Sequence, residues 1–213
     1  MSIPDPKPYQ LITQLRRGII TGRYPPGSSL REEALQAEFG ISRGPVREAL
    51  RLLEFRGLAE HTPRKGFRVR TFSKETIEDL YRMRAMLERH AVECAARGDV
   101  VQLVTQLEAS NERMAAHYKA KRVEAYLSEN VTFHDLIIQS GRNEPLRRTL
   151  AVLNEMAEPL RFALLEKDIS ASRSVVEHQR ITSLLKQRLF NAAGAATELH
   201  ILASLSSVLA IEK

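Results

Sequence analysis

The sequence holds a single cysteine, Cys94, among its 213 residues. One cysteine cannot close an intramolecular disulfide, which excludes a disulfide-stapled secreted domain. The chain shows no basic, apolar, small-residue leader of the secretory kind at its start. Its uncharged apolar runs are far shorter than the roughly 18 residues that a membrane span needs. We therefore expect a cytoplasmic protein with no transmembrane segment and no membrane partner.

An excess of charge of either sign is missing from most of the chain. Residues 73–213 hold 19 basic and 19 acidic side chains, whereas residues 1–72 hold 13 Lys and Arg against 7 Asp and Glu. The net charge of +6 therefore lies in the first third. A basic segment suits a phosphate polyanion, because each neutralised phosphate releases condensed counterions. A solvated basic surface explains the charge alone equally well.

The N-terminal third carries the signals of three short helices. Apolar residues at helical spacing mark the first two of them: Leu11, Ile12, Leu15 and Ile19, then Leu30, Leu35 and Phe39. Gly40 stops the second helix, and Ser42 is the predicted N-cap of the third. Because only a two-residue turn separates them, these helices form a tight helix-turn-helix, whose second helix enters the DNA major groove by its N-terminal end.

Two stripes run along the third predicted helix. One is apolar and comprises Val46, Ala49, Leu50 and Leu53. Arg43, Arg47 and Arg51 form the other, about 110° away around the helix. Near the start of the helix, the guanidinium groups of Arg43 and Arg47 can pair with guanine edges or phosphates. A charged solvent face is the alternative interpretation.

Two short strands, predicted at 58–61 and 67–70, flank a turn rich in helix and strand breakers. This hairpin is a predicted wing. Its basic side chains are Arg64, Lys65, Arg68 and Arg70. Gly66 would let the backbone approach a phosphate or a groove floor closely. Each element alone also fits an ordinary surface, but their succession over residues 1–72 indicates a winged helix-turn-helix domain.

Several motifs in this domain resemble the GntR family of bacterial regulators. They are Pro-Pro-Gly at 25–27, Leu-Arg-Glu at 30–32, Gly-Ile-Ser-Arg-Gly-Pro-Val-Arg-Glu-Ala-Leu-Arg-Leu-Leu-Glu at 40–54, Gly-Leu at 57–58 and Pro-Arg-Lys-Gly-Phe at 63–67. The resemblance implies that Ser42, Arg43 and Arg47 contact bases and phosphates. It also implies that Gly66 lies over the minor groove, with Lys65 beside it as a further DNA contact. Glu33 stands where the family often has arginine, so no contact is transferred to it.

Beyond Phe72 strand signals cease and helical periodicity continues. We expect six helices at 74–97, 99–119, 121–140, 144–166, 171–189 and 191–211. No heptad register persists long enough for an extended coiled coil, so residues 73–213 should form an antiparallel six-helix bundle. The predicted fold class is mainly α, with an N-terminal winged helix-turn-helix that has a small β-hairpin wing and a C-terminal helical bundle.

Histidines in this second domain suggest a metal site. Asn130 and His134 share one helix face at i and i+4, and His178 and His200 lie on the fifth and sixth predicted helices. Imidazoles converging from three helices can hold a divalent cation, with Asn130 as an oxygen ligand or positioning a water. Helix histidines are more often surface or hydrogen-bonded residues, so spacing alone leaves this open.

The pattern Asn130-x3-His134, Glu177-His178 and His200 resembles the FCD ligand-binding domain of the FadR branch, in its shorter, VanR-like form. That resemblance implies that Asn130 and the three histidines bind a metal, zinc or nickel, which helps hold a small organic acid. It assigns Arg84 to the effector carboxylate, and it extends to the stretch that begins at Asn143, which we also assign to the effector.

Two departures qualify the resemblance to this domain. Asn130 stands where aspartate is commoner, which removes a negative charge and should weaken a divalent site. Arg188 and Leu189 replace a frequent Gly-Asp between the last two helices, which should alter only a loop.

The combined prediction is a homodimeric repressor that binds an inverted-repeat operator in double-stranded DNA under the control of a small carboxylate effector. A metalloenzyme is a second hypothesis, because three histidines with an open position also form a catalytic zinc arrangement. However, Asp135 lies about 100° around the helix from His134 and no nucleophile motif accompanies the site, so we expect no enzyme. A protein-interaction module is a third hypothesis.

Overall fold

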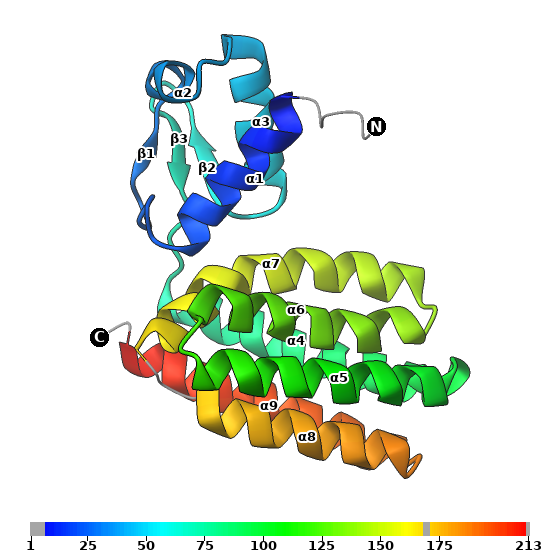
Figure 1. Ribbon diagram of the computed structural model, residues 1–213. Helices are drawn as coiled ribbons and strands as arrows, with labels where there is room; N and C mark the ends of the chain where they lie inside the picture. Colours follow the sequence, from blue (N-terminus) through cyan, green and yellow to red (C-terminus); the bar gives the residue numbers. More distant parts are fainter. Residues whose placement is uncertain (1–6, 168–170, 212–213) are drawn as a thin grey trace, which may run out of the picture. The chain divides into compact units, whose positions relative to one another are not determined.

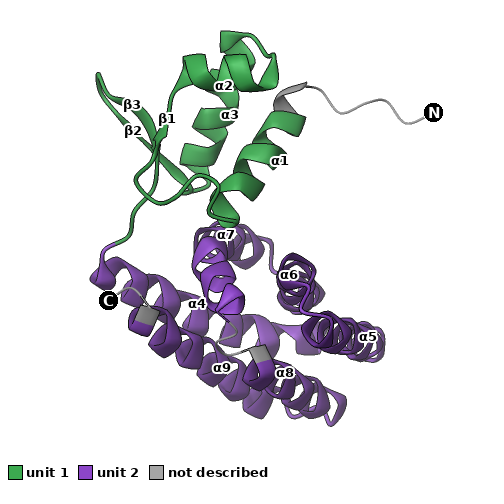
Figure 2. Cartoon of the chain, turned by 60° about the vertical axis from the view of Figure 1, so that its left-hand side comes forward, with its two compact units in different colours: residues 1–72 green, residues 73–213 purple. Residues whose placement is uncertain are grey.

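The structure is a computed structural model that describes residues 7–167 and 171–211 (Figure 1). The chain divides into two compact units, Met1–Phe72 and Ser73–Lys213 (Figure 2). Strands occur only in the first unit among the described residues, and the second unit is helical. The mainly helical fold class predicted from the sequence is confirmed.

The first unit is a winged helix-turn-helix. Its elements are α1 (Lys7–Ile20), β1 (Ser29–Leu30), α2 (Glu32–Phe39), α3 (Arg43–Phe55), β2 (Ala59–Thr62) and β3 (Gly66–Val69). The strands form an antiparallel sheet in the order β1-β3-β2. Gly40 ends α2 with φ 63°, a left-handed conformation that glycine adopts without steric cost, and its N–H donates to the carbonyl of Gln36. This turn places α3 directly after α2.

The sequence analysis missed one strand and misplaced Leu30. Leu30 was predicted in the second helix, but it lies in β1 opposite Phe67, and α2 begins only at Glu32. A two-residue strand is too short to show the alternation by which strands are recognised. Leu30 still enters the core, with 1% of its surface exposed, but it does so from the sheet.

The apolar stripe of α3 is the centre of the first unit's core. Val46, Ala49, Leu50 and Leu53 are completely buried against α1 and the sheet. Burying a side chain such as leucine or valine stabilises a fold by about 1.5–3 kcal/mol, so this stripe fixes how α3 is rotated. The stripe of Arg43, Arg47 and Arg51 therefore faces solvent. Ser42 occupies the predicted N-cap position, but its side chain accepts no capping hydrogen bond and is exposed.

The second unit contains six α-helices within its described residues. They are α4 (Lys74–Cys94), α5 (Val100–Lys119), α6 (Val123–Ser140), α7 (Glu144–Glu166), α8 (Ala171–Lys186) and α9 (Phe190–Ile211). A short 3-10 helix, Ala95–Arg97, follows α4, so the predicted helix at 74–97 ends earlier than expected. The break before α9 also lies earlier, around Arg188, whose φ of 59° turns the chain.

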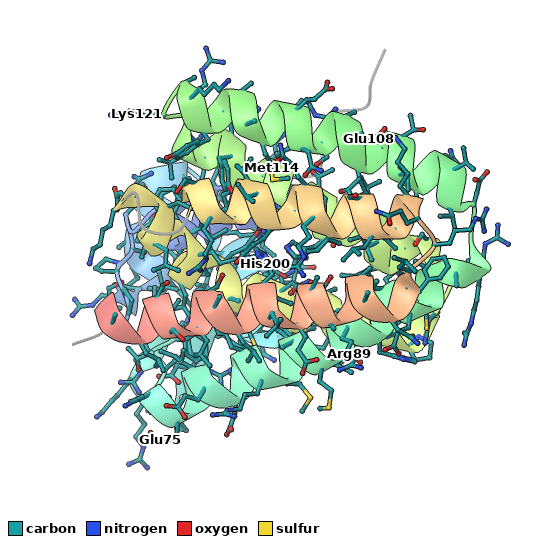
Figure 3. All side chains as sticks on the ribbon, turned by 90° about the horizontal axis from the view of Figure 1, so that it is seen from below. Glu75, Arg89, Glu108, Met114, Lys121 and His200 are labelled. Atoms are coloured by element: carbon teal, nitrogen blue, oxygen red, sulfur yellow. The ribbon has the colours of Figure 1, made fainter. Side chains whose placement is uncertain are left out.

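Packing contacts connect α4 with α9, α5 with α6 and α8, and α8 with α9. Seen from below, α8 and α9 run side by side, with His200 between them (Figure 3). A core of apolar residues from α4, α5, α6, α8 and α9 fills the bundle. The polar residues described below lie within this core.

The most apolar helix of the bundle is α9. Its stretch Phe190–Ala210 is long and apolar enough by composition to cross a membrane, with a mean hydropathy of 1.3. Ala193, Ile201 and Val208 are nevertheless buried, and the helix packs on α4 and α8. Packing in the core accounts for part of the apolarity of α9, since 39% of its most apolar window is buried.

Candidate functional site

Two exposed arginines lie at the start of α3 and are held by one carboxylate. The Nε of Arg43 donates to Glu32 Oε2 at 2.9 Å, and the Nε of Arg47 donates to Glu32 Oε1 at 2.8 Å. The hydrogen bond from Arg47, followed by that from Arg43, keeps the pKa of Glu32 below its ordinary value despite partial burial. The side chains of Arg43 and Arg47 are 70% and 49% exposed, so donors not bound to Glu32 are accessible to solvent. Glu32 therefore aligns two donor groups that a phosphate or a base edge can take over.

The hairpin presents Lys65 and Gly66 at its exposed end. Gly66 has φ 80°, and no heavy atom lies within 4 Å of the place where a Cβ would stand. Arg64 is also left-handed at φ 66°, and Lys65 N–H closes the turn on the carbonyl of Thr62. Arg68 on β3 pairs with Glu60 on the neighbouring strand. The open backbone at Gly66 is thus available for close approach to a large partner.

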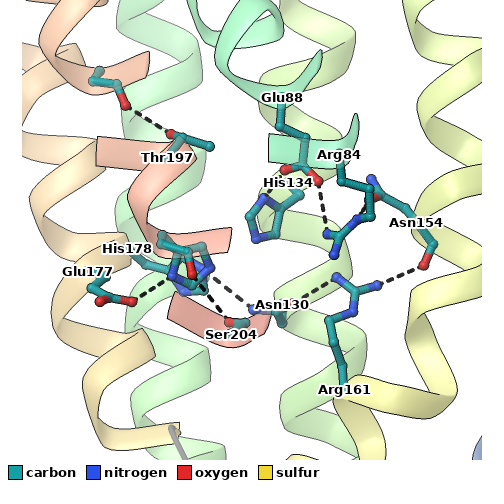
Figure 4. Close-up of polar contacts among 12 residues, drawn as sticks. Arg84, Glu88, Asn130, His134, Asn154, Arg161, Glu177, His178, Thr197 and Ser204 are labelled. Carbon is teal, nitrogen blue, oxygen red and sulfur yellow. Dashed lines mark hydrogen bonds and ion pairs between the residues drawn. The ribbon is translucent and has the colours of Figure 1, made fainter. Parts of the chain in front are cut away.

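The three predicted histidines come together inside the second unit. His134 from α6, His178 from α8 and His200 from α9 are 3%, 0% and 5% exposed. Each offers a ring nitrogen, and these nitrogens lie within 4.8 Å of one another (Figure 4). Three imidazole nitrogens at such spacing form a possible face of a metal coordination sphere.

Two carboxylates that the sequence analysis did not assign orient this cluster. Glu88 Oε2 lies 2.6 Å from His134 Nδ1, and Glu177 Oε2 lies 2.7 Å from His200 Nδ1. Carboxylates in this position fix the tautomer and ring orientation of metal-binding histidines and leave Nε2 for the ion. The i, i+4 spacing of Arg84 and Glu88 was the available signal for Glu88.

Burial sets the protonation of the cluster. It is the main cause that lowers the pKa of His134, and it holds the pKa of His178 well below the ordinary value, with His200 adding to the effect. Burial alone would raise the pKa of Glu88, but His134 and Arg84 outweigh it and lower that pKa instead. His134 and His178 are therefore neutral and Glu88 is ionised at neutral pH, which is the state that binds a cation. The donor set fits a nitrogen-preferring divalent ion such as zinc or nickel.

Asn130 adjoins the histidines, but its oxygen is turned away from them. Its Nδ2 lies 3.5 Å from His178 Nε2, and its Oδ1 accepts from Arg161 Nη1 at 3.3 Å. To act as an oxygen ligand the amide must turn over and give up the bond from Arg161. Oxygen and nitrogen of an amide are assigned from such contacts. The three imidazoles are thus the core of the candidate metal site.

A pair of arginines from different helices borders the histidines. Arg84 is 2% exposed, and it donates to Asn154 Oδ1 at 2.6 Å and to Glu88 Oε1 at 3.0 Å. Arg161 donates to Asn130 and, at 3.2 Å, to the carbonyl of Asn154, while its Nε is buried with no partner among the described residues. No sequence motif marked Arg161. Its unused donor favours an anion in the chamber that Arg84, Arg161, His134 and His200 line.

Asn143 has a different position from the other predicted effector residues. It is the N-cap of α7, where its Oδ1 accepts from Leu146 N–H at 3.2 Å. Its Nδ2 lies 3.9 Å from Cys94 Sγ, and the residue does not line the chamber beside the histidines. The motif that begins at Asn143 is explained by helix capping in this structure.

Comparison with known proteins covers both units. Residues 9–69 match the family described as bacterial regulatory proteins, gntR family, and residues 79–203 match the FCD domain. The chain is 32% identical over 197 residues to the uncharacterised HTH-type transcriptional regulator YdhC of Bacillus subtilis, covering 90% of this chain and 87% of that one. It is 30% identical over 194 residues to the Nta operon transcriptional regulator of Aminobacter aminovorans, covering 90% of each. A gluconate operon transcriptional repressor of Bacillus licheniformis is 34% identical over 127 residues, which are 60% of this chain and 52% of that one.

Solved structures share the fold over almost the whole chain. E. coli McbR/YncC superposes with a TM-score of 0.83 at 20% identity, covering 97% of this chain and 98% of that chain. A putative transcriptional regulator GntR from Rhodococcus sp. RHA1 superposes with a TM-score of 0.80 at 20% identity, covering 96% and 98%. The matched families and relatives are transcriptional regulators and not enzymes. The chain belongs to the GntR family of bacterial transcriptional regulators, with a DNA-binding helix-turn-helix domain followed by an FCD domain.

Proposed function

We propose that this regulator is a cytoplasmic homodimeric repressor whose affinity for an inverted-repeat operator is controlled by a small organic acid bound beside a divalent metal ion. The observation that carries the proposal is the buried cluster of three imidazoles, two of which line a chamber together with Arg84 and Arg161. The repressor role is supported by relatives named as repressors, among them the gluconate operon repressor of Bacillus licheniformis.

On the DNA side, Arg43 and Arg47 enter the major groove and exchange Glu32 for base edges or phosphates. Ser42 contacts the DNA sugar-phosphate backbone beside them, because its exposed hydroxyl is not used as a helix cap. Lys65 and Gly66 place the wing against the minor groove. The paired arginines and the open Gly66 backbone support this assignment.

On the effector side, His134, His178 and His200 hold the metal ion, zinc or nickel, which supplies a Lewis acid for an anionic ligand. Asn130 completes the site by turning its amide or through a water. Arg84 and Arg161 receive the carboxylate of the effector. Asn143 contributes indirectly, because it caps α7, the helix that carries Asn154 and Arg161.

The dimer is supported by apolar side chains that α4 leaves exposed. Met83 and Met86 lie one turn apart and are 47% and 59% exposed. A second copy that covers them gives the two-fold symmetry that an inverted repeat requires. The effector then controls DNA binding because it binds with different affinity to the DNA-bound and the DNA-free arrangement of the dimer.

The test is selection of bound fragments from the source genome by the purified protein. The same selection is repeated with the double variant Arg43→Ala and Arg47→Ala, and with Arg23→Ala as an exposed control outside α3. We expect a short inverted repeat to be enriched by the parent and the control but not by the double variant. Equal enrichment by all three proteins would show that α3 does not read the sequence.

A further inference from the structure

The chamber beside the histidines is too small to enclose an elongated organic acid. Its volume is about 30 Å³, and it is bordered by Arg84, Arg161, His134 and His200. Pockets for small molecules usually measure about 300–1,000 Å³, whereas a water molecule occupies about 30 Å³. The chamber therefore has room for the polar end of a ligand and not for its body.

A second cavity, which we call the α5–α6 cavity, adjoins this chamber. It has a volume of about 410 Å³ and lies where the end of α5, the start of α6 and the end of α7 meet. Its lining residues are His117, Tyr118, Lys119, Lys121, Arg122, Val123, Tyr126, Leu165 and Glu166. Tyr126 and Leu165 line both spaces, so the cavity and the chamber share one wall.

The lining of the α5–α6 cavity has two kinds of surface. Tyr118, Val123, Tyr126 and Leu165 provide an apolar wall, and Tyr126 is 3% exposed. Lys119, Lys121 and Arg122 are exposed at its rim, and among the described residues they make no ion pair. Apolar walls stabilise a hydrocarbon body by removing it from water, and a positive rim attracts an anion.

We infer that the effector is an elongated organic acid with an apolar body: its carboxylate lies in the chamber with Arg84 and Arg161, and its body fills the α5–α6 cavity once the side chains of Tyr126 and Leu165, which separate the two spaces, turn aside. This inference rests on the proposed function and names the class of its ligand. Short, highly polar acids bind the same chamber with lower affinity, because they leave the apolar wall in contact with water.

The test measures dissociation constants of straight-chain carboxylates by calorimetry on the zinc-loaded protein, from propanoate through hexanoate to decanoate. Burial of one methylene is worth about 0.8 kcal/mol, or roughly fourfold in affinity. We expect the affinity to rise by about twofold to fourfold per methylene until the cavity is full.

Two variants test whether the increase in affinity with chain length arises in the α5–α6 cavity. Val123→Trp occupies part of the α5–α6 cavity and should flatten the increase with chain length, with the largest loss for decanoate and the smallest for propanoate, which needs the least of the cavity. An unchanged far-UV circular dichroism spectrum shows that the variant is folded. Val101→Trp is the matched control, because Val101 is 70% exposed on α5 and does not line the cavity. It should keep the full increase.

Each contrary result has a distinct meaning. Equal affinity for all three acids in the parent would overturn the inference and leave the proposed effector site standing. An increase with chain length that survives Val123→Trp would place the body elsewhere and overturn it too. Failure of every acid to bind would overturn both the inference and the proposed control by a carboxylate.

Discussion

Both units of the protein place arginines against a glutamate, but in opposite surroundings. In the first unit, Arg43 and Arg47 share Glu32 at the surface, and their side chains are 70% and 49% exposed. In the second unit, Arg84 pairs with Glu88 in the core, where the two side chains are 2% and 3% exposed. The residue types are the same, and the solvent around them differs.

Exposure to solvent determines whether each arginine–glutamate cluster can exchange its partners. An exposed ion pair contributes little to stability, typically 0–1 kcal/mol, so a phosphate can displace Glu32 at small cost. A buried pair cannot be separated without leaving an uncompensated charge, which costs about 3–5 kcal/mol. The surface cluster is thus suited to exchanging partners, and the buried cluster is suited to holding a fixed geometry around the imidazoles.

The largest effect is expected from Glu88→Gln. This change leaves Arg84 buried without its counter-charge and removes the carboxylate from His134, so we expect the free energy of unfolding to fall by about 3 kcal/mol or more. The measurement is chemical denaturation of the metal-free protein. Glu93→Gln, on the same helix and paired with the exposed Arg89, is the control and should cost less than about 1 kcal/mol. Equal losses would erase the contrast between buried and exposed pairs.

The next effect concerns the surface cluster. Arg47→Ala should weaken binding to the selected operator by about 1–3 kcal/mol, because one base-reading guanidinium is lost, while the stability of the fold falls by less than about 1 kcal/mol with the loss of the pair to Glu32. Operator titration at fixed salt, together with denaturation, measures both quantities. Arg51→Ala, one turn further along the same exposed face, serves for comparison and should have a smaller effect. Unchanged operator affinity in Arg47→Ala would contradict its role in DNA recognition.

Asn130→Asp introduces a carboxylate into the buried cluster. The added negative charge faces the imidazoles and Arg161, so the dissociation constant for zinc should fall about tenfold, or about 1.4 kcal/mol. Competition with a chromophoric chelator measures it. Asn154→Asp adds the same charge against Arg84, away from the chamber. If both variants gain equally, position 130 contributes charge but no ligand atom.

The smallest effect is expected from Glu32→Gln, and it depends on pH. The pKa of Glu32 is lowered by Arg47 and Arg43, so its pairing stabilises the folded state above the unfolded pKa, near 4.5, and is lost as the pH falls through the folded pKa. The parent should exceed the variant by less than about 1 kcal/mol at pH 6, and the two should converge in acid. Denaturation from pH 6 to pH 3 tests this, and a constant difference would exclude titration of Glu32 as the cause.

The same substitution separates affinity from specificity. Glu32→Gln removes a negative charge that would lie near the DNA phosphates, so the affinity for non-specific DNA should increase. The ratio of operator to non-specific affinity should decrease, because Arg43 and Arg47 are no longer aligned. An unchanged ratio would mean that Glu32 does not position these arginines.

Elements with a long hydrophobic period were predicted correctly from the sequence. The candidate metal site was predicted from residue spacing together with the family resemblance. The stripe of α3 and the convergence of His134, His178 and His200 follow from helical spacing and family resemblance. β1 was missed because two residues carry no period. Arg161 was missed because its role depends on how α7 packs against α4 and α6, which no local pattern encodes. The resemblance led to Asn143 as an effector residue, and the structure places it at a helix cap.

The packing of α4 on α9 also has a consequence during synthesis of the chain. These are the first and last helices of the second unit, and their contact closes its core across more than a hundred residues of sequence. Domains generally fold in order as they leave the ribosome. The first unit can therefore complete its core before α9, the helix that packs on α4, has been synthesised. A chain released before α9 is made would contain the first unit but would lack His200, so the candidate metal site would be incomplete.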